Sequence, residues 1–227
     1  MKKNRVFTDE ELKEMGKILR DSIVEAIEAG DKEKAKELLD LMYDDAKLTV
    51  SFFSEWVTVL LDYVYVNCGE KALEETLRNR FGISEAKRIE SYPKMDLRNQ
   101  VKSHVAGLRK LFQKMEIEED DEKVCIKMAP CGSGQLLVES GVYGPPWNLS
   151  RMKPGPLTWG TSDFPIYCAH GAVQEILAIE KLGRPLYVHW FPPKVATESC
   201  RFCFYKDINS VPEEVYTRVG KKKPNEP

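Results

Sequence analysis

Tyr167-Cys168-Ala169-His170 is the stretch around which this chain of 227 residues is organised. The residues after it repeat at the spacing of an amphipathic helix until Gly183, so we expect a turn that enters a helix over 163–182. Cys168 and His170 then lie near the first turn of that helix. A helix N-terminus lowers the pKa of a thiol, which favours a thiolate at Cys168 that acts as nucleophile or ligand.

Two strands are expected after this helix, over 185–191 and 199–207. Side chains alternate between the two faces of a strand, so each strand has one face with aromatic and ligand-type residues. The residues on these two faces are Tyr187, His189, Phe191, Cys200, Phe202 and Phe204. If the strands form a hairpin, His189 and Cys200 meet across it, whereas Cys203 has the opposite parity and points away.

A glycine-rich turn around Cys131 lies upstream of this cluster. Pro130, Gly132 and Gly134 force the turn and allow another group to approach the backbone closely. The segment is not a phosphate-binding loop, because the Gly-Lys-Ser/Thr ending is missing. Cys131 is therefore either a ligand or nucleophile, or a turn cysteine without a role.

The segment 141–160 is rich in glycine, proline and aromatic residues, and we expect a long loop. Such a loop inside a compact domain is usually a lid or a binding loop. Trp147 and Trp159 would close over an apolar or aromatic ligand, with Tyr143 beside them and Arg151 available for a carboxylate. The alternative is that these residues only pack the loop against the protein.

Composition narrows the functional classes. Acidic and basic residues nearly balance, 36 against 34, so no overall field favours nucleic acid, and the N-terminus lacks the apolar core of a signal peptide. The apolar run 48–68 is interrupted by Glu55 and Asp62, which predicts a buried helix and not a membrane span. We therefore expect a cytoplasmic protein whose six cysteines stay reduced.

The N-terminal half is predicted to be helical. Thr8 and Glu11 form a capping box for a helix that ends at Gly30, and further helices are expected over 31–43, 48–68, 70–81, 85–90 and 95–115. The acidic run 116–122 is expected to be a solvated loop, followed by a strand over 123–128 that contains Cys125. The predicted fold is α+β, with a helical region over 1–118 packed on a domain with a small antiparallel sheet over 119–227.

The cysteines and histidines of the second half match the needs of zinc. Zinc takes four nitrogen or sulfur ligands in structural sites and three in catalytic sites, where the fourth place holds water or substrate. Cys168, His170 and Cys200 are the first-choice ligands, and His189 and Cys131 compete for the remaining place. Whichever of these two is not bound would act as nucleophile or general acid and base.

The segment 168–205 resembles the C-terminal part of the 4-vinyl-reductase-type small-molecule-binding domain. The matching features are the cysteine at a helix start, the run Ile179-Glu180-Lys181-Leu182-Gly183-Arg184-Pro185-Leu186, an aromatic strand and the closing Cys200-Arg201-Phe202. The resemblance implies zinc held by Cys168 and Cys200 beside an apolar ligand pocket. That family has an acidic ligand and a further cysteine between these two. In this chain His189 falls near the acidic position and the middle cysteine is absent, which favours an open site.

The ending also resembles that of the L-2-amino-thiazoline-4-carboxylic acid hydrolase-like proteins, which join a helical region to such a domain. We therefore expect an enzyme, a hydrolase or lyase, that acts on a small carboxylate- or ring-bearing molecule with zinc or a reactive cysteine. The alternatives are a ligand-binding sensor module with a structural zinc and a structural protein whose cysteines are only core residues. No nucleic acid or membrane partner is expected, and a homodimer is allowed for.

Overall fold

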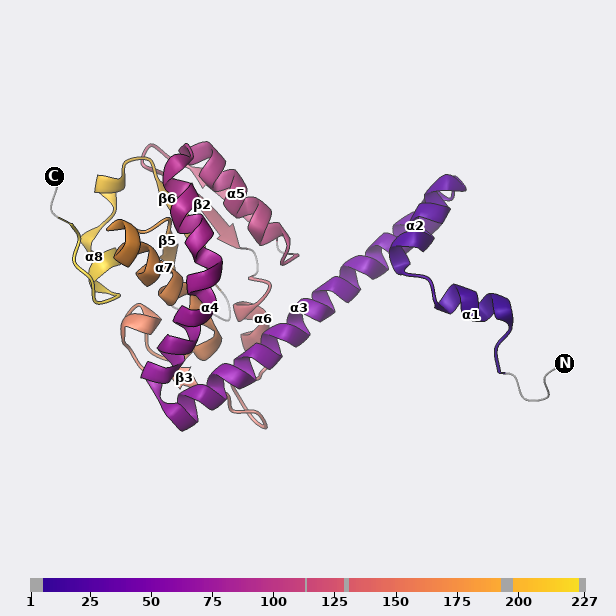
Figure 1. Ribbon diagram of the computed structural model, residues 1–227, viewed down its shortest axis with the longest axis horizontal. Coiled ribbons are helices and arrows are strands. Elements are labelled where there is room, and N and C mark those ends of the chain that lie inside the picture. The colour runs from indigo at the N-terminus through magenta and orange to yellow at the C-terminus, as the bar shows by residue number, and fades with distance from the viewer. Residues whose placement is uncertain (1–5, 113, 129–130, 193–197, 225–227) are drawn as a thin grey trace. The chain divides into compact units, whose positions relative to one another are not determined.

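The computed structural model describes residues 6–112, 114–128, 131–192 and 198–224 (Figure 1). The chain divides into two compact units, Met1–Thr49 and Val50–Pro227. The division that we expected at 118/119 falls instead inside a strand of the second unit. The helices after Val50 therefore belong to the same unit as the sheet.

The first unit is a short helical unit. Helix α1 (Asp9–Met15) begins at the expected capping box between Thr8 and Glu11 but ends at Gly16, so that a separate α2 (Leu19–Glu28) follows. Helix α3 (Lys32–Cys68) starts where the Asp31 carboxylate accepts the backbone N–H of Lys34 at 3.0 Å. The two helices expected over 31–43 and 48–68 are this one helix, because the intervening acidic residues are exposed and interrupt no packing.

The second unit contains the rest of α3, then α4 (Glu70–Ser91) and α5 (Leu97–Arg109). Gly69, at a φ of +86°, separates α3 from α4. The helix end expected at Gly82 was wrong, because α4 continues through this glycine. A glycine inside a helix costs about 1 kcal/mol, and burial of Leu73 and Leu77 before it and Glu85 after it holds both halves of α4 in place.

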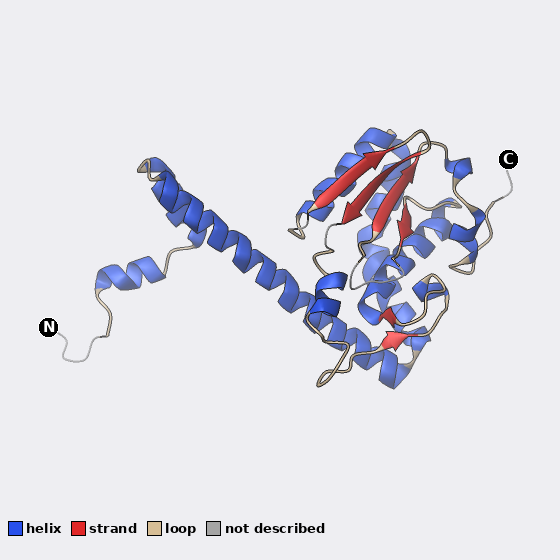
Figure 2. Ribbon diagram, turned by 180° about the vertical axis from the view of Figure 1, so that it is seen from behind, coloured by secondary structure: helices blue, strands red, loops and turns tan. Residues whose placement is uncertain are grey.

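A four-stranded antiparallel sheet forms the other layer of this unit, in the order β1-β2-β6-β5 (Figure 2). Its strands are β1 (Met115–Glu119), β2 (Lys123–Met128), β5 (Val188–Trp190) and β6 (Arg201–Tyr205). The α+β prediction is confirmed. The acidic run expected to be a loop instead supplies most of β1, which is compatible with its charges because β1 is an edge strand with exposed side chains.

Helix α7 (Ala169–Leu182) packs against α4, and short elements close the rest of the unit. These elements are α6 (Gly134–Glu139), β3 (Arg151–Met152), β4 (Phe164–Pro165) and α8 (Glu213–Thr217). The core lies between α7, α4 and the segments around β4 and α8. Among the described residues, no helix has both the length and the apolar character needed to cross a membrane.

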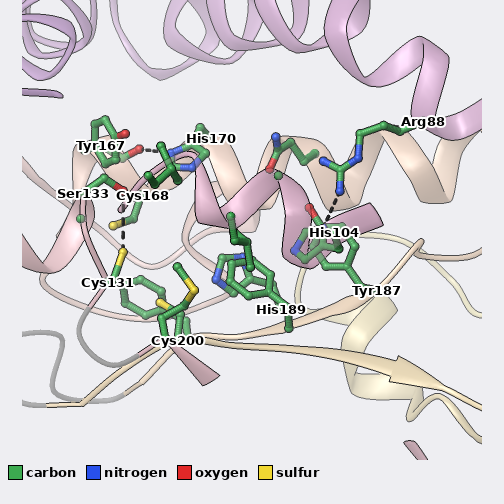
Figure 3. A pocket seen from close by; sticks show the side chains of 18 of the residues that line it. Arg88, His104, Cys131, Ser133, Tyr167, Cys168, His170, Tyr187, His189 and Cys200 are labelled. Atoms are coloured by element: carbon green, nitrogen blue, oxygen red, sulfur yellow. Dashed lines mark hydrogen bonds between the residues drawn. The ribbon is translucent and has the colours of Figure 1, made fainter. Parts of the chain in front are cut away.

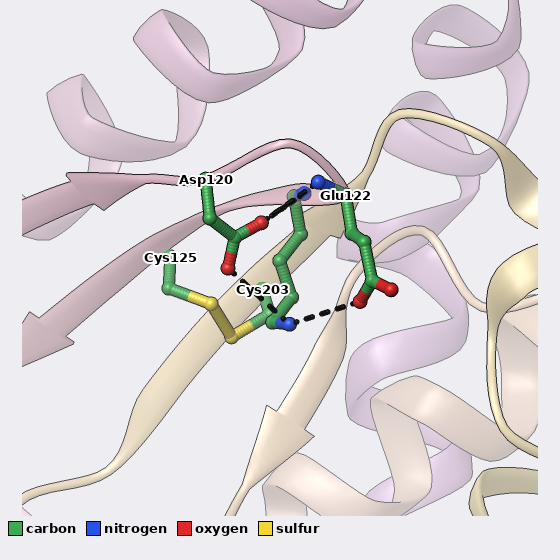
Figure 4. The surroundings of a disulfide bond; sticks show 5 residues. Asp120, Glu122, Cys125 and Cys203 are labelled. Atoms are coloured by element: carbon green, nitrogen blue, oxygen red, sulfur yellow. Dashed lines mark hydrogen bonds and ion pairs between the residues drawn. A yellow bond between two sulfur atoms is a disulfide. The ribbon is translucent and has the colours of Figure 1, made fainter.

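Strand register assigns the cysteines of the sheet to opposite faces. The expected hairpin of β5 and β6 is present, with His189 opposite Phe202, and Cys200 follows the same parity as Phe202. On the other face Cys125 of β2 lies directly opposite Cys203 of β6, and a disulfide joins them (Figure 4). The expectation that all six cysteines stay reduced was therefore wrong for this pair. The remaining free cysteines are Cys68, Cys131, Cys168 and Cys200.

Candidate functional site

A cavity of about 380 Å³ lies in the second unit, between the sheet and the helices α4, α5 and α7 (Figure 3). Its walls are largely apolar and aromatic. The aromatic residues that line it are Tyr92, Tyr167, Tyr187, Phe191 and Phe202. Among the described lining residues, Arg88 is the one permanently charged side chain. This volume and lining suit a small, partly apolar molecule with one anionic or polar group.

Three free thiols lie at one end of the cavity, and they come from segments far apart in the sequence. Cys131 precedes α6, Cys168 is the residue at which α7 begins, and Cys200 precedes β6. Figure 3 shows their sulfur atoms at the same end, with the Sγ of Cys131 3.7 Å from the Oγ of Ser133. A Cβ at position 134 would lie 2.7 Å from the Sγ of Cys168, so Gly134 leaves the room that this sulfur occupies.

Burial keeps two of these thiols protonated. It raises the pKa of Cys168 well above the ordinary value, and the neighbouring Cys200 and Cys131 act in the same direction. Burial likewise raises the pKa of Cys200, again assisted by Cys131. The lowered thiol pKa expected from the helix N-terminus at Cys168 was wrong, because removal from water outweighs the helix dipole at a fully buried sulfur.

His170 has a defined tautomer. Its Nδ1 lies 2.6 Å from the backbone carbonyl oxygen of Tyr167, and a carbonyl can only accept, so Nδ1 carries the proton. The lone pair is then on Nε2. Burial lowers the pKa of His170, which keeps the ring neutral. A neutral imidazole whose Nδ1–H is held by a backbone carbonyl is the usual state of a metal ligand or a general base.

His189 lines the same cavity from β5 and is held by a buried ion pair. Its backbone N–H donates to Glu175 at 3.1 Å, and its carbonyl oxygen accepts from Arg218 at 2.8 Å. Arg218 also pairs with the buried Glu175 at 2.8 Å. Burial lowers the pKa of His189 well below the ordinary value, and the Nε2 atom has no hydrogen-bond partner among the described residues. The ring is therefore neutral and positioned by its own backbone.

His104 and Arg88 lie at the opposite end of the cavity from the thiols (Figure 3). The Arg88 guanidinium donates to Nδ1 of His104 at 2.6 Å, which fixes the His104 proton on Nε2. Burial, together with the charge of Arg88, lowers the pKa of His104 to about 3. The Arg88 guanidinium also pairs with the Glu85 carboxylate at 3.2 Å, and the side chain of Arg88 is more exposed than that of Glu85. This end of the cavity is therefore positive or neutral at all ordinary pH values.

The predicted metal ligands and catalytic residues all lie on this cavity. Cys168, His170, His189 and Cys200, the expected ligands, line it together with Cys131. As the side chains stand, however, no three histidine, cysteine, aspartate or glutamate groups of the described residues are placed to hold one metal ion.

The four residues expected to bind substrate are not among the described residues that line this cavity. Trp147 is 65% exposed and lies beside a separate groove on α3. Trp159 is buried behind His189, with ring centroids 4.6 Å apart. Arg151 stacks on the ring of Tyr143 at 4.9 Å and pairs with Asp163. Tyr143, Arg151 and Trp159 thus pack within the protein, the alternative that the sequence left open, whereas Trp147 is exposed.

Sequence reasoning missed the helical wall of the cavity. Arg88 is on α4 and His104 on α5, each in a segment that looked like an ordinary surface helix. Neither residue belongs to a sequence motif that marks a site. His104 is 5% exposed and lies on the amphipathic helix face that contains Val105 and Leu108. That placement on an apolar face is the signal that was available in the sequence.

No family model, no curated protein and no solved structure matches the chain.

Proposed function

We propose that this chain is an enzyme that acts on a small ring- or carboxylate-bearing molecule held in the cavity, in a hydrolase- or lyase-type reaction. One observation carries the proposal. Three free thiols and a neutral histidine with its lone pair on Nε2 come together, from separate segments, on a cavity with aromatic walls. Buried imidazole nitrogens without a hydrogen-bond partner cost stability, so their concentration beside free thiols at one cavity favours a functional role.

Zinc is the cofactor that we propose for the thiol end. The donors fit it in kind, since Cys168, Cys200 and Cys131 offer soft sulfur ligands and His170 offers a neutral nitrogen. When bound, zinc would supply a Lewis acid that polarises the substrate or lowers the pKa of a water molecule. The buried thiols are protonated in its absence, so binding releases protons and is favoured by rising pH.

The other residues of the cavity have roles that follow from their state. Nε2 of His170 is the nitrogen that would bind zinc, because it has the lone pair and the ring is neutral. Whichever of His189 and Cys131 is not bound to zinc remains the candidate for the acid–base or nucleophilic group, as the sequence predicted. Arg88 is placed to attract a substrate carboxylate to the end opposite the thiols, and the aromatic walls would hold a ring.

A ligand-binding sensor with a structural zinc is the second candidate. The observation that favours it is the neutrality of the site, since the three histidines of the chain all have lowered pKa values and the two most buried thiols are protonated. A cavity with aromatic walls and neutral histidines can bind an apolar ring without any reaction taking place. In that case ligand binding is measurable and no product forms.

The partner and compartment predictions stay part of this proposal. We place the chain in the cytoplasm, with a small-molecule substrate or ligand and without nucleic acid or a membrane as partner. The Cys125–Cys203 disulfide is the feature that weighs against the cytoplasm, because reducing systems keep most thiols free there. A count of thiols in protein denatured straight from cells, with and without reductant, decides the redox state of this pair.

Metal analysis of protein purified without a metal-affinity tag tests the proposal. We expect about one zinc per chain in the wild type. Cys68→Ala should hold the same amount, because Cys68 is exposed and is not among the residues that line the cavity. Cys168→Ala and Cys200→Ala are expected to lose the metal. A thermal-shift panel of small aromatic and heterocyclic carboxylates then identifies ligands, and product analysis separates the enzyme from the sensor. Wild-type protein that contains no metal would rule out zinc as the cofactor.

A further inference from the structure

Residues 50–66 of α3, which belong to the second unit, have their serine, threonine, aspartate and glutamate side chains on the inside. Every serine, threonine, aspartate and glutamate of this segment is buried or half-buried: Ser51, Ser54, Glu55, Thr58 and Asp62. The large apolar residues on the other half are exposed. We call this half the outer face of α3, and its members are Phe52, Phe53, Trp56, Val57, Val59, Leu60, Tyr63 and Val66.

The polar half is used within the chain. Asp62 accepts the backbone N–H of Ser150 at 2.7 Å, and Thr58, with no exposed surface, donates to the carbonyl oxygen of Ser54. Asp62 is therefore bonded within the chain, and Glu55 is half-buried. An amphipathic helix that turns its polar half inward leaves an apolar half that water does not stabilise.

A groove continues this outer face. It has a volume of about 310 Å³ and lies between α3 and the segment 142–149. Phe52, Glu55, Trp56 and Val59 form one wall, and the exposed Trp147 belongs to the other. Phe52, Phe53 and Trp56 also contact one another, with ring centroids 5.6 to 6.2 Å apart. The surface thus combines protruding aromatic rings with a hollow of side-chain size.

We propose that the outer face of α3 binds the same face of a second copy of this chain, α3 against α3 about a two-fold axis. The area is sufficient. An aromatic side chain carries about 150–250 Å² and these are half to two-thirds exposed, so that with the aliphatic residues the face offers on the order of 1,000 Å². A stable interface needs about 800 Å² per partner, and the largest apolar patch of a typical monomer is about 300–600 Å².

The character of the surface favours a second copy over other occupants. No lysine or arginine occurs between Lys47 and Lys71, and the three charged residues in that interval, Glu55, Asp62 and Glu70, are acidic. Anionic lipid and nucleic acid both require basic residues, so neither fits this face. A self-complementary surface needs both a projecting side chain and a hollow that can receive it. Here the exposed ring of Trp147 or Tyr63 on one copy would enter the apolar groove beside Trp56 on the other.

Sedimentation velocity of the full chain across the micromolar range tests the proposal. We expect a dimer for the wild type and a monomer for Trp56→Glu/Tyr63→Glu, with dissociation at least about a hundredfold easier because central aromatic residues dominate interfaces. The control is Ile83→Glu, an exposed apolar residue of α4 outside the outer face, which is expected to dimerise as the wild type does.

Three results would overturn the proposal: a wild type that stays monomeric, a dimer that the double substitution leaves intact, or a monomer that sediments with phosphatidylcholine vesicles. If the glutamates prevent folding, as far-UV circular dichroism would reveal, the milder Leu60→Gln/Tyr63→Gln carries the same test. The outcome is independent of zinc and of turnover, because none of these residues lines the cavity with the three thiols.

Discussion

The two faces of the sheet hold the same residue type in two different states. Cys203 lies in β6, and Cys200 comes immediately before this strand. Side chains alternate between the two faces along the strand, so these cysteines, three positions apart, point to opposite sides of the sheet. Cys203 meets Cys125 and forms a disulfide, in surroundings that include the exposed Asp120 and Glu122 (Figure 4). Cys200 instead faces a cavity in which its neighbours are two further free thiols and neutral histidines.

This difference shows that the position of the neighbouring residues, and not the cysteine itself, decides whether a disulfide forms or the thiol stays free. A residue directly opposite on the next strand fixes a single covalent partner. Three thiols from separate segments, none opposite another in a ladder, remain available for a ligand. The disulfide face therefore has a structural role in this account, and the cavity face has the functional one.

The largest expected effect on the cavity face is the loss of Arg218. Arg218→Met leaves the buried Glu175 carboxylate without its partner, and we expect the free energy of unfolding to fall by about 3–5 kcal/mol. The matched control is Arg201→Met, an exposed arginine on the disulfide face of β6, with an expected change below about 0.5 kcal/mol. Urea unfolding measures both. Equal losses would mean that the cavity face has no special dependence on this ion pair.

The disulfide face should respond to removal of its cross-link. Cys125→Ala/Cys203→Ala is expected to lower the free energy of unfolding by about 2–4 kcal/mol, since the bond joins positions 78 residues apart and constrains the unfolded chain. Cys131→Ala, a half-buried free cysteine of the cavity, is the comparison, with an expected loss below about 1 kcal/mol. The reverse order of stability losses would contradict the division of roles between the faces.

A pair of glycine substitutions tests how tightly the cavity face is packed. A Cβ on Gly171 would lie 2.9 Å from both Nδ1 of His189 and a ring carbon of Trp159, so Gly171→Ala is expected to cost about 1–3 kcal/mol. Gly82→Ala on α4 has open space and should stabilise by about 0.5–1 kcal/mol, because alanine favours the helix. Thermal unfolding compares them. Stabilisation by both substitutions would show that the His189 region is loose.

Acid should weaken the cavity face through His104. Its pKa is about 3 in the folded protein and about 6.5 when unfolded, so the unfolded state alone binds this proton between those values. The contribution of His104 to the free energy of unfolding is therefore fully present above pH 6.5. It is lost as pH falls toward 3, by up to about 1.4 kcal/mol per pH unit. His104→Gln, which can still accept from Arg88, should reduce the slope by that amount in urea titrations at several pH values. An unchanged slope would show that His104 is not buried neutral.

Local rules predicted the parts of this molecule that depend on nearby residues. The start of α7 at Cys168 and the common faces of β5 and β6 follow from periodicity, and five of the six residues expected on those faces line the cavity. The exception is Phe204, which lies in the hydrophobic core. The capping box at Thr8 is also present as expected.

The remaining features depend on contacts that a single sequence does not encode locally. The parity of Cys203 was predictable, but its partner depends on the pairing of β2 with β6, which lie 73 positions or more apart in sequence. Arg88 and His104 reach the cavity only because α4 and α5 pack beside the sheet. The inverted polarity of α3 was hidden for a related reason, since periodicity defines two faces of a helix and does not say which one is buried.

Site-resolved alkylation of the native protein, read by mass spectrometry, tests the central claim most directly. We predict that zinc-loaded protein protects Cys131, Cys168 and Cys200. A chelator should raise the labelling of all three, most at the half-buried Cys131 and more slowly at Cys168 and Cys200, which are buried and protonated. Cys68 should react in both states, and Cys125 and Cys203 should react in neither until a reductant is added. Zinc-independent labelling of the three cavity cysteines, or labelling of the Cys125–Cys203 pair without reductant, would contradict the account.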